Sequence, residues 1–197
     1  MRIISGEKRG MNILGPKGVE VTRPITDRIK ESVFNVLQKY GPFAGSYAAD
    51  IFSGTGSMGL ESLSRGAQHV TFVENDPGAI EILKTNIEKG GWKNRSKIVK
   101  ANAFKVGAAY LDGPKFDFAF VDPPYALSRE TSEVSQLGSL LALLAQQISD
   151  TGVVIARTEV EVQLLKRYGR LVLVDRRDWG SMAINFLELE KPGETSV

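Results

Sequence analysis

The stretch Asp50-Ile51-Phe52-Ser53-Gly54-Thr55-Gly56-Ser57-Met58-Gly59 decides the fold of this chain. The apolar run Tyr47–Phe52 is typical of a buried strand, and the residues Met58–Ser64 follow a helical pattern. The three glycines fit the spacing G-x-G-x-x-G, in which glycine lets the backbone approach a ligand and adopt dihedral angles that other side chains forbid. The stretch therefore predicts a ligand-binding turn between a strand and a helix, although a tight turn without a ligand would use the same glycines.

An acidic residue follows this glycine loop at an informative distance. Glu74 stands 20 residues after Gly54, at the end of the next predicted strand. At that spacing a carboxylate can accept hydrogen bonds from the ribose hydroxyls of a nucleotide. Asp50 lies at the start of the loop, where it would repel a pyrophosphate but suits a ligand that carries an ammonium group. The pair favours S-adenosylmethionine, which has an amino acid end and no phosphate.

Strands and helices alternate along the chain beyond this first unit. Such alternation predicts a parallel sheet with helices on both faces. The last two strands are joined by the turn-like residues 177–181, so the sheet is expected to finish with an antiparallel hairpin. Seven strands are predicted, at Tyr47–Phe52, Val70–Glu74, Lys97–Ala101, Phe116–Val121, Gly152–Thr158, Arg170–Arg176 and Met182–Glu190, and the helices between them at Met58–Ser64, Pro77–Gly90, Phe104–Leu111 and Gln136–Ser149.

The first 25 residues are predicted to form a small extension. Two apolar runs, Arg2–Ser5 and Met11–Leu14, flank a glycine-containing turn and favour a β-hairpin, and Thr26 is expected to cap the helix that follows. Residues 1–30 carry seven basic and three acidic side chains, whereas the remainder carries 18 basic and 20 acidic ones. This basic front end indicates either an RNA or DNA partner or only a solvated basic tail. We expect an extension of residues 1–25, a main domain of residues 26–191 and a frayed tail of residues 192–197.

Composition excludes several classes of protein. The chain has 197 residues, of which 42% are hydrophobic and 24% charged, as in an ordinary globular domain. It has no cysteine and one histidine, which argues against disulfides, thiolate nucleophiles and a metal centre. No apolar run approaches the roughly 18 residues of a membrane span, and the amino terminus lacks the pattern of a secretory signal. We therefore expect a soluble cytoplasmic protein without a metal or a membrane partner.

A third polar segment follows the third predicted strand. Asn102 and Ala103 are well placed to flank an adenine ring, and Phe104 offers a stacking face. An ordinary helix cap by Asn102 explains the same residues on spacing alone.

The tetrapeptide Asp122-Pro123-Pro124-Tyr125 follows the apolar strand Phe116–Val121. It therefore lies at the carboxyl end of a central strand, where open α/β sheets bind ligands. The two prolines fix the backbone and remove two amide donors, so carbonyl and carboxylate oxygens are left as acceptors beside an aromatic ring. This set suits a neutral amino group on a planar ring, with N–H bonds directed at Asp122 and the Pro123 carbonyl and with Tyr125 stacked on the base. The alternative is a rigid turn capped by an aspartate.

Four features together resemble the class I methyltransferases that use S-adenosylmethionine and modify exocyclic amino groups: Asp50–Gly59, Glu74, Asn102-Ala103 and Asp122–Tyr125. The segment Arg23–Glu31, with the Arg9-Gly10 hairpin, makes the chain similar to the bacterial 16S ribosomal RNA guanine-N2 methyltransferases, the RsmD-type family. The resemblance runs from Arg2 to about Glu190. It departs at Ile25, where members usually have threonine, and at Met11, where they tend to have a basic residue.

The resemblance implies a Rossmann-like fold and methyl transfer to the N2 amine of a guanine in 16S ribosomal RNA. The substrate would be the small ribosomal subunit or its assembly intermediate, and the enzyme is expected to be a monomer. Whether Asp122 takes the proton or only positions the amine stays open here.

The implied catalytic residues are Asp122, Pro123 and Tyr125. The implied cofactor-binding residues are Asp50, Phe52, Gly54, Gly56, Glu74, Asn75, Asn102, Ala103, Phe104, Arg23 and Thr26. The implied RNA-contacting residues are Pro124, Arg28, Lys8 and Arg9.

Three alternatives compete with this interpretation. An NAD-dependent oxidoreductase would use the same glycines and Glu74, but it leaves the Asp122–Tyr125 segment without a role. An amino-methyltransferase could act instead on another RNA, on DNA adenine or on a protein glutamine. An RNA-binding assembly factor could retain an inactive cofactor fold.

Overall fold

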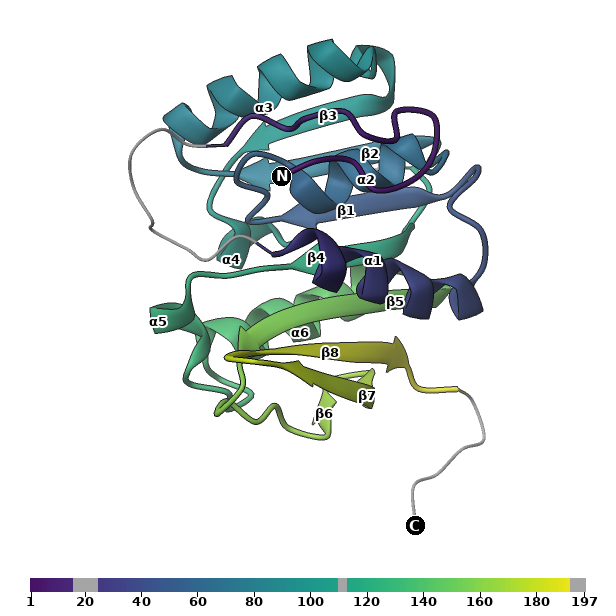
Figure 1. The fold of residues 1–197 in the computed structure, drawn as a ribbon. Coiled ribbons are helices and arrows are strands. Elements are labelled where there is room, and N and C mark those ends of the chain that lie inside the picture. Colours follow the sequence, from purple (N-terminus) through teal and green to yellow (C-terminus); the bar gives the residue numbers. More distant parts are fainter. Residues whose placement is uncertain (16–24, 110–112, 192–197) are drawn as a thin grey trace.

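A computed structural model describes residues 1–15, 25–109 and 113–191 (Figure 1). Its centre is an eight-stranded sheet with the order β3-β2-β1-β4-β5-β8-β7-β6. The first five strands pair in parallel, and β8, β7 and β6 add to them in antiparallel fashion, as the sequence predicted. The strands are β1 (Tyr47–Ile51), β2 (His69–Glu74), β3 (Ser96–Lys100), β4 (Phe116–Val121), β5 (Ile148–Glu159), β6 (Arg167–Tyr168), β7 (Leu171–Trp179) and β8 (Met182–Leu189).

The described residues contain eight strands where the sequence predicted seven. The additional strand, β6, has two residues and pairs with the start of β7. Two residues are too short to show a periodic pattern, although the side chain of Tyr168 is fully buried. The last hairpin is also tighter than predicted, because β7 continues to Trp179 and leaves only Gly180 and Ser181 in the turn.

Helices cover both faces of the sheet (Figure 1). Side chains of α1, α2 and α3 join one hydrophobic core, and those of α4 and α6 join the other. The helices are α1 (Asp27–Leu37), α2 (Ser57–Ser64), α3 (Pro77–Gly90), α4 (Ala103–Val106), α5 (Tyr125–Ser128) and α6 (Gln136–Gln147), with 3-10 turns at Gln38–Tyr40 and Lys93–Arg95.

Two helix predictions needed correction and one short helix was missed. The helix predicted at Phe104–Leu111 ends at Val106, and residues 110–112 lie outside the described part. The helix predicted at Gln136–Ser149 ends at Gln147 because β5 begins at Ile148. The four-residue helix α5 begins within the Asp-Pro-Pro-Tyr segment and is too short for a periodic signal.

Helix α1 begins where the sequence predicted. The hydroxyl oxygen of Thr26 accepts a hydrogen bond from the Ile29 amide at 3.3 Å, which satisfies one of the free N–H groups of the first turn. The apolar face of the helix buries Phe34, whose ring lies 5.6 Å from that of Phe120 on β4. This packing holds the second half of α1 against β4.

Residues 2–13 form the predicted hairpin. Arg2 and Asn12 make an antiparallel bridge, and the Ile3 amide donates to the Met11 carbonyl at 2.9 Å. Gly6 lies in the turn with φ +85°, and a Cβ there would stand 1.8 Å from the carbonyl oxygen of Ser64 on α2. The hairpin therefore touches α2 backbone to backbone.

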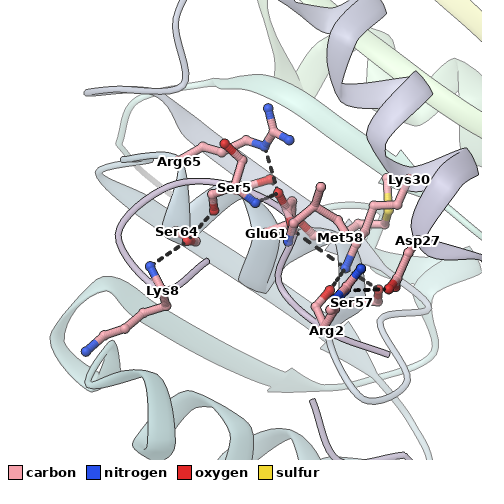
Figure 2. Close-up of polar contacts among 12 residues, drawn as sticks. Arg2, Ser5, Lys8, Asp27, Lys30, Ser57, Met58, Glu61, Ser64 and Arg65 are labelled. Carbon is pink, nitrogen blue, oxygen red and sulfur yellow. Dashed lines mark hydrogen bonds and ion pairs between the residues drawn. The ribbon is translucent and has the colours of Figure 1, made fainter. Parts of the chain in front are cut away.

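A buried carboxylate holds the hairpin on the main domain (Figure 2). Glu61 of α2 is fully buried and accepts hydrogen bonds from the amides of Ile4 at 2.7 Å and Ser5 at 3.0 Å. Its charge is balanced by Arg65, at 2.8 Å, and by the ammonium of Lys30 on α1, at 3.6 Å. Lys30 in turn donates to the carbonyl of Arg2 at 2.7 Å. One carboxylate thus joins the hairpin, α1 and α2.

No helix in the described part of the chain is long and apolar enough to cross a membrane.

We expect Glu61→Ala to destabilise the protein by about 3–5 kcal/mol, because it leaves the Lys30 ammonium buried without its carboxylate and removes the acceptor of two hairpin amides. Urea denaturation measures the change in the free energy of unfolding. The control is Glu81→Ala, since Glu81 is 71% exposed and pairs with Lys84 on the surface of α3; this change should cost less than about 1 kcal/mol. Equal effects of the two substitutions would contradict the structural role of Glu61.

Candidate active site

Four of the predicted site residues follow neighbouring strands at one edge of the sheet. Parallel pairing places the carboxyl ends of β1, β2, β3 and β4 side by side, and β1 lies between β2 and β4. The chain order reverses between β1 and β4, and such a switch point is where open α/β sheets bind ligands. Asp50, Glu74, Asn102 and Asp122 stand at the ends of these four strands or directly after them.

The glycine loop connects β1 to α2 through tight backbone contacts. The amide of Gly54 donates to the Glu74 carboxylate at 2.7 Å, and Gly56 precedes α2 with φ +90°. A Cβ on Gly59 would stand 2.3 Å from the Phe72 ring of β2, so glycine permits the close approach of helix and strand. Phe52 adopts φ +61°, a backbone region that side chains other than glycine rarely occupy. These contacts hold the loop against Glu74 and against β2.

Asp50 is buried beneath this loop. Its carboxylate accepts a hydrogen bond from the amide of Gly59 at 2.8 Å. Burial raises the pKa of Asp50 to about 8, and the nearby carboxylates of Asp122 and Glu74 add to the rise, whereas the Gly59 amide and Lys30 oppose it. The neutral form of this acid is therefore favoured at pH 7, and a cation placed beside it would lower its pKa.

The carboxylate of Glu74 is oriented by backbone amides. One oxygen accepts from Gly54, and the other accepts from Asn75 at 2.8 Å and from Asp76 at 2.9 Å. These bonds hold the side chain against the glycine loop at the end of β2. Asn75 itself is exposed beside it.

The segment after β3 forms a helix cap and an aromatic wall. Asn102 accepts a hydrogen bond from the Phe104 amide at 3.0 Å and so caps α4, which was the alternative interpretation of this segment. The Phe104 ring lies 4.9 Å from the ring of Phe52 in the glycine loop, at an angle of 58°. Ala103 is buried behind them. Two half-buried rings thus border the same edge.

The segment Asp122–Tyr125 is held by an arginine that the sequence analysis did not single out. Arg157 of β5 donates through one terminal nitrogen to Asp122 at 2.8 Å and through the other to the Tyr125 hydroxyl at 2.8 Å. Its guanidinium carbon also lies 5.3 Å from the centre of the Tyr125 ring. Partial burial raises the pKa of Asp122, and Arg157 opposes that rise. A charged residue inside the apolar run of β5 was the one signal that could have identified it.

The basic residues expected to contact RNA lie on the hairpin and on α1. Lys8, Arg9 and Arg28 have exposed side chains. Arg9 and Arg28 line a cavity of about 400 Å³ between the hairpin and α1, which they share with the Arg2–Asp27 ion pair and Glu31.

A second cavity, of about 610 Å³, lies between the start of α1 and the β7–β8 turn. Thr26 and Trp179 line opposite parts of it, together with Met1, Ile25, Ile29 and Met182. The Thr26 hydroxyl is used as a helix cap.

The remaining predicted residue, Arg23, lies outside the described residues. The residues that the structure describes contain no group of three or more acidic or histidine side chains placed to hold a metal.

Comparisons with known proteins give one family. The sequence profile of the family described as "Conserved hypothetical protein 95" matches residues 1–188. The chain is 34% identical over 183 residues to the "Putative rRNA methyltransferase YlbH" of Bacillus subtilis, covering 91% of this chain and 94% of that protein. It is 30% identical over 201 residues to the "Ribosomal RNA small subunit methyltransferase D" of Escherichia coli, covering 100% and 94%. Among solved structures, "Putative methyltransferase yhhF" from Escherichia coli superposes with a TM-score of 0.78 at 29% identity, covering 96% and 98%.

We expect the free energy of unfolding of the ligand-free protein to depend on pH through the buried carboxyl group of Asp50. Because burial raises the pKa of Asp50 from 3.8 to about 8, the folded chain binds an extra proton between these values, and its stability relative to Asp50→Asn falls as pH rises through that window. The slope approaches about 1.4 kcal/mol per pH unit. Urea denaturation of both proteins at pH 5, 6.5 and 8 measures it. A difference that is constant, or that grows in favour of the wild type with pH, would contradict the raised pKa.

Proposed function

The chain belongs to the family described as Conserved hypothetical protein 95, and we propose that it transfers a methyl group from S-adenosylmethionine to the N2 amine of a guanine in small-subunit ribosomal RNA. The relatives of this chain are named as ribosomal RNA methyltransferases. The chain itself is a methyltransferase of the RsmD type. The observation that carries the proposal is the position of Asp122–Tyr125 at the same sheet edge as the glycine loop. The choice of guanine N2 rests on the resemblance of Arg23–Glu31 to the RsmD-type enzymes.

The residues of the glycine loop fit S-adenosylmethionine. The Ser53 hydroxyl is buried and has no hydrogen-bond partner among the described residues, so it is available to a ligand in the loop. Asp50 supplies a buried acid where the ligand has an ammonium group, and Glu74 supplies acceptors for the ribose hydroxyls. A pyrophosphate would instead meet the carboxylate of Asp50, which disfavours the dinucleotide alternative. Phe52 and Phe104 offer apolar surface to the adenine.

The Asp122–Tyr125 segment would orient the amine that receives the methyl group. When bound, S-adenosylmethionine supplies an activated methyl group on a sulfonium. The guanine N2 amine is a poor nucleophile because its lone pair is delocalised into the ring. Hydrogen bonds from N2 to the Asp122 carboxylate and the Pro123 carbonyl would direct the lone pair outward and stabilise the positive charge that develops on nitrogen. Tyr125 would stack on the base, and Pro124, the cap of α5, keeps the turn rigid and borders the RNA.

The surface beside α1 supports an RNA partner. Lys8, Arg9 and Arg28 are exposed on the hairpin and α1, where they would contact phosphates. The cavity beside Trp179 opens at the same edge as Asp122, because β8 runs antiparallel to β5 and begins where β5 ends. It has room for a base turned out of its RNA context. A monomer with so small an extension fits a substrate whose shape is already formed, such as the small ribosomal subunit or its assembly intermediate.

We expect tritiated S-adenosylmethionine to label small ribosomal subunits from cells that lack the endogenous enzyme, with the label in N2-methylguanosine. Asp122→Ala should abolish labelling yet leave the affinity for S-adenosylmethionine within about 2-fold, because Asp122 is assigned to the amine and not to the cofactor. Nucleoside analysis and cofactor titration measure the two quantities. Label in another nucleoside would refute guanine N2, and absence of cofactor binding by the wild type would refute the cofactor assignment.

We expect the double substitution Arg9→Gln with Arg28→Gln to weaken binding of small subunits about 10-fold and to lower the slope of log affinity against log salt concentration by about two, one for each lost phosphate contact. Filter binding at several salt concentrations measures both. The matched control is Lys166→Gln with Arg170→Gln, which removes the same charge from exposed positions beside β6. If the control pair lowers the slope as much, the effect belongs to net charge and not to the hairpin and α1.

A further inference from the structure

Arg157 is a charged side chain in the middle of a buried sheet. Strand β5 lies between β4 and β8, and the residues before Arg157 on it, Val153–Ala156, are buried and apolar. The Arg157 side chain is 6% exposed. A buried guanidinium is stable only where its charge and its donors are matched. Two of its partners, Asp122 and Tyr125, are residues assigned above to the reacting amine and its base.

We propose that Arg157 is a positioning residue for methyl transfer, which holds the Asp122 carboxylate ionised and aimed at the amine and holds the Tyr125 ring in place to stack on the base. The inference rests on the proposed function, because it assigns the tasks of Asp122 and Tyr125 from it. Nothing in the Asp-Pro-Pro-Tyr segment itself supplies a partner for the carboxylate.

The geometry shows how one side chain can serve both partners. Asp122 follows β4 and Tyr125 begins α5, and the two terminal nitrogens of Arg157 reach one each at 2.8 Å. This fork is a property of the planar guanidinium that an ammonium lacks. The Asp122 side chain is 43% exposed although Arg157 is only 6% exposed. Arg157 therefore approaches the carboxylate from the protein interior and leaves its open side to the substrate.

The charges around Asp122 explain why a cation is needed there. Asp50 on the neighbouring strand β1 carries a second carboxylate, and the mutual repulsion contributes to the raised pKa of Asp50. Among the described residues, Arg157 from β5 is the cation that hydrogen-bonds the Asp122 carboxylate, and it also donates to the Tyr125 hydroxyl of α5. Arg157 is thus the cation that favours the ionised form of Asp122. An ionised carboxylate accepts stronger hydrogen bonds from an amine than a neutral acid does.

The test compares Arg157→Gln and Arg157→Lys with the wild type. Single-turnover methylation of small ribosomal subunits is measured against pH at saturating S-adenosylmethionine. We expect Arg157→Gln to lower the rate at pH 7 by about 10–100-fold, to leave the cofactor affinity within about 2-fold, and to move the acidic limb of the profile up by about one pH unit or more. Arg157→Lys should return the acidic limb of the pH profile to its wild-type position but restore only part of the rate. An ammonium keeps the positive charge but lacks the two planar terminal nitrogens that bind Asp122 and Tyr125 together.

The control is Arg129→Gln. Arg129 also pairs with a carboxylate of β5, Glu159, but its side chain is 67% exposed and it does not touch Asp122 in the described contacts. It should leave the rate and the limb unchanged. An Arg157→Gln protein that folds with an unmoved limb and a rate near that of wild type would overturn the proposal. If Arg157→Gln does not fold, Arg157→Lys decides, and a wild-type rate in that variant overturns the proposal.

A substrate-free measurement separates this inference from the proposed function. The carboxyl carbon of Asp122 is observed by ¹³C NMR and identified by its absence in Asp122→Asn. Its pKa should rise in Arg157→Gln and stay near the wild-type value in Arg157→Lys. A wild type that fails to methylate any subunit would refute the proposed function alone, whereas an Asp122 titration that does not move in Arg157→Gln would refute the role of Arg157 alone.

Discussion

The hydrogen bond from the Gly59 amide to the buried carboxylate of Asp50 organises the rest of the molecule. It fastens the first turn of α2 to the end of β1 and so closes the glycine loop between them. A helix fixed in this way carries Glu61 to the position where it meets the hairpin and Lys30. The loop, the helix and the hairpin are therefore linked by contacts that run from Asp50 through α2 to Glu61.

The switch point of the sheet concentrates carboxyl groups. Asp50, Glu74 and Asp122 lie at the ends of three adjacent strands. Burial strongly raises the pKa of Asp50. Two buried cations favour the ionised forms of these groups: Lys30 lowers the pKa of Asp50, and Arg157 donates a hydrogen bond to Asp122. The edge is left acidic and partly open, which suits a positively charged methyl donor and an amino group that gives hydrogen bonds. Basic groups of the hairpin and α1 stand outside this edge, where a polyanion would approach.

The parts that could be predicted from sequence depend on neighbours along the chain. The glycine spacing, the placement of Glu74 and the Thr26 cap involve residues within one or two elements, so their patterns are visible in a single chain. The contact between Arg157 and Asp122 joins residues 35 positions apart, and that between Glu61 and Ile4 joins residues 57 apart. In the sequence Glu61 resembles an ordinary solvated residue of a helix, because only the docked hairpin buries it. Strand β6 and helix α5 were missed because two and four residues are too few to repeat a periodic pattern.

The close contact at Gly6 has a consequence for the evolution of this chain. Gly6 is exposed, and positions on surface turns usually drift freely among polar residues. Here a positive φ and a Cβ position only 1.8 Å from the Ser64 carbonyl leave no room for any side chain. Sequence change at Gly6 is therefore limited by the helix on which the hairpin rests, whereas the neighbouring side chains of Lys8 and Arg9 are exposed to solvent.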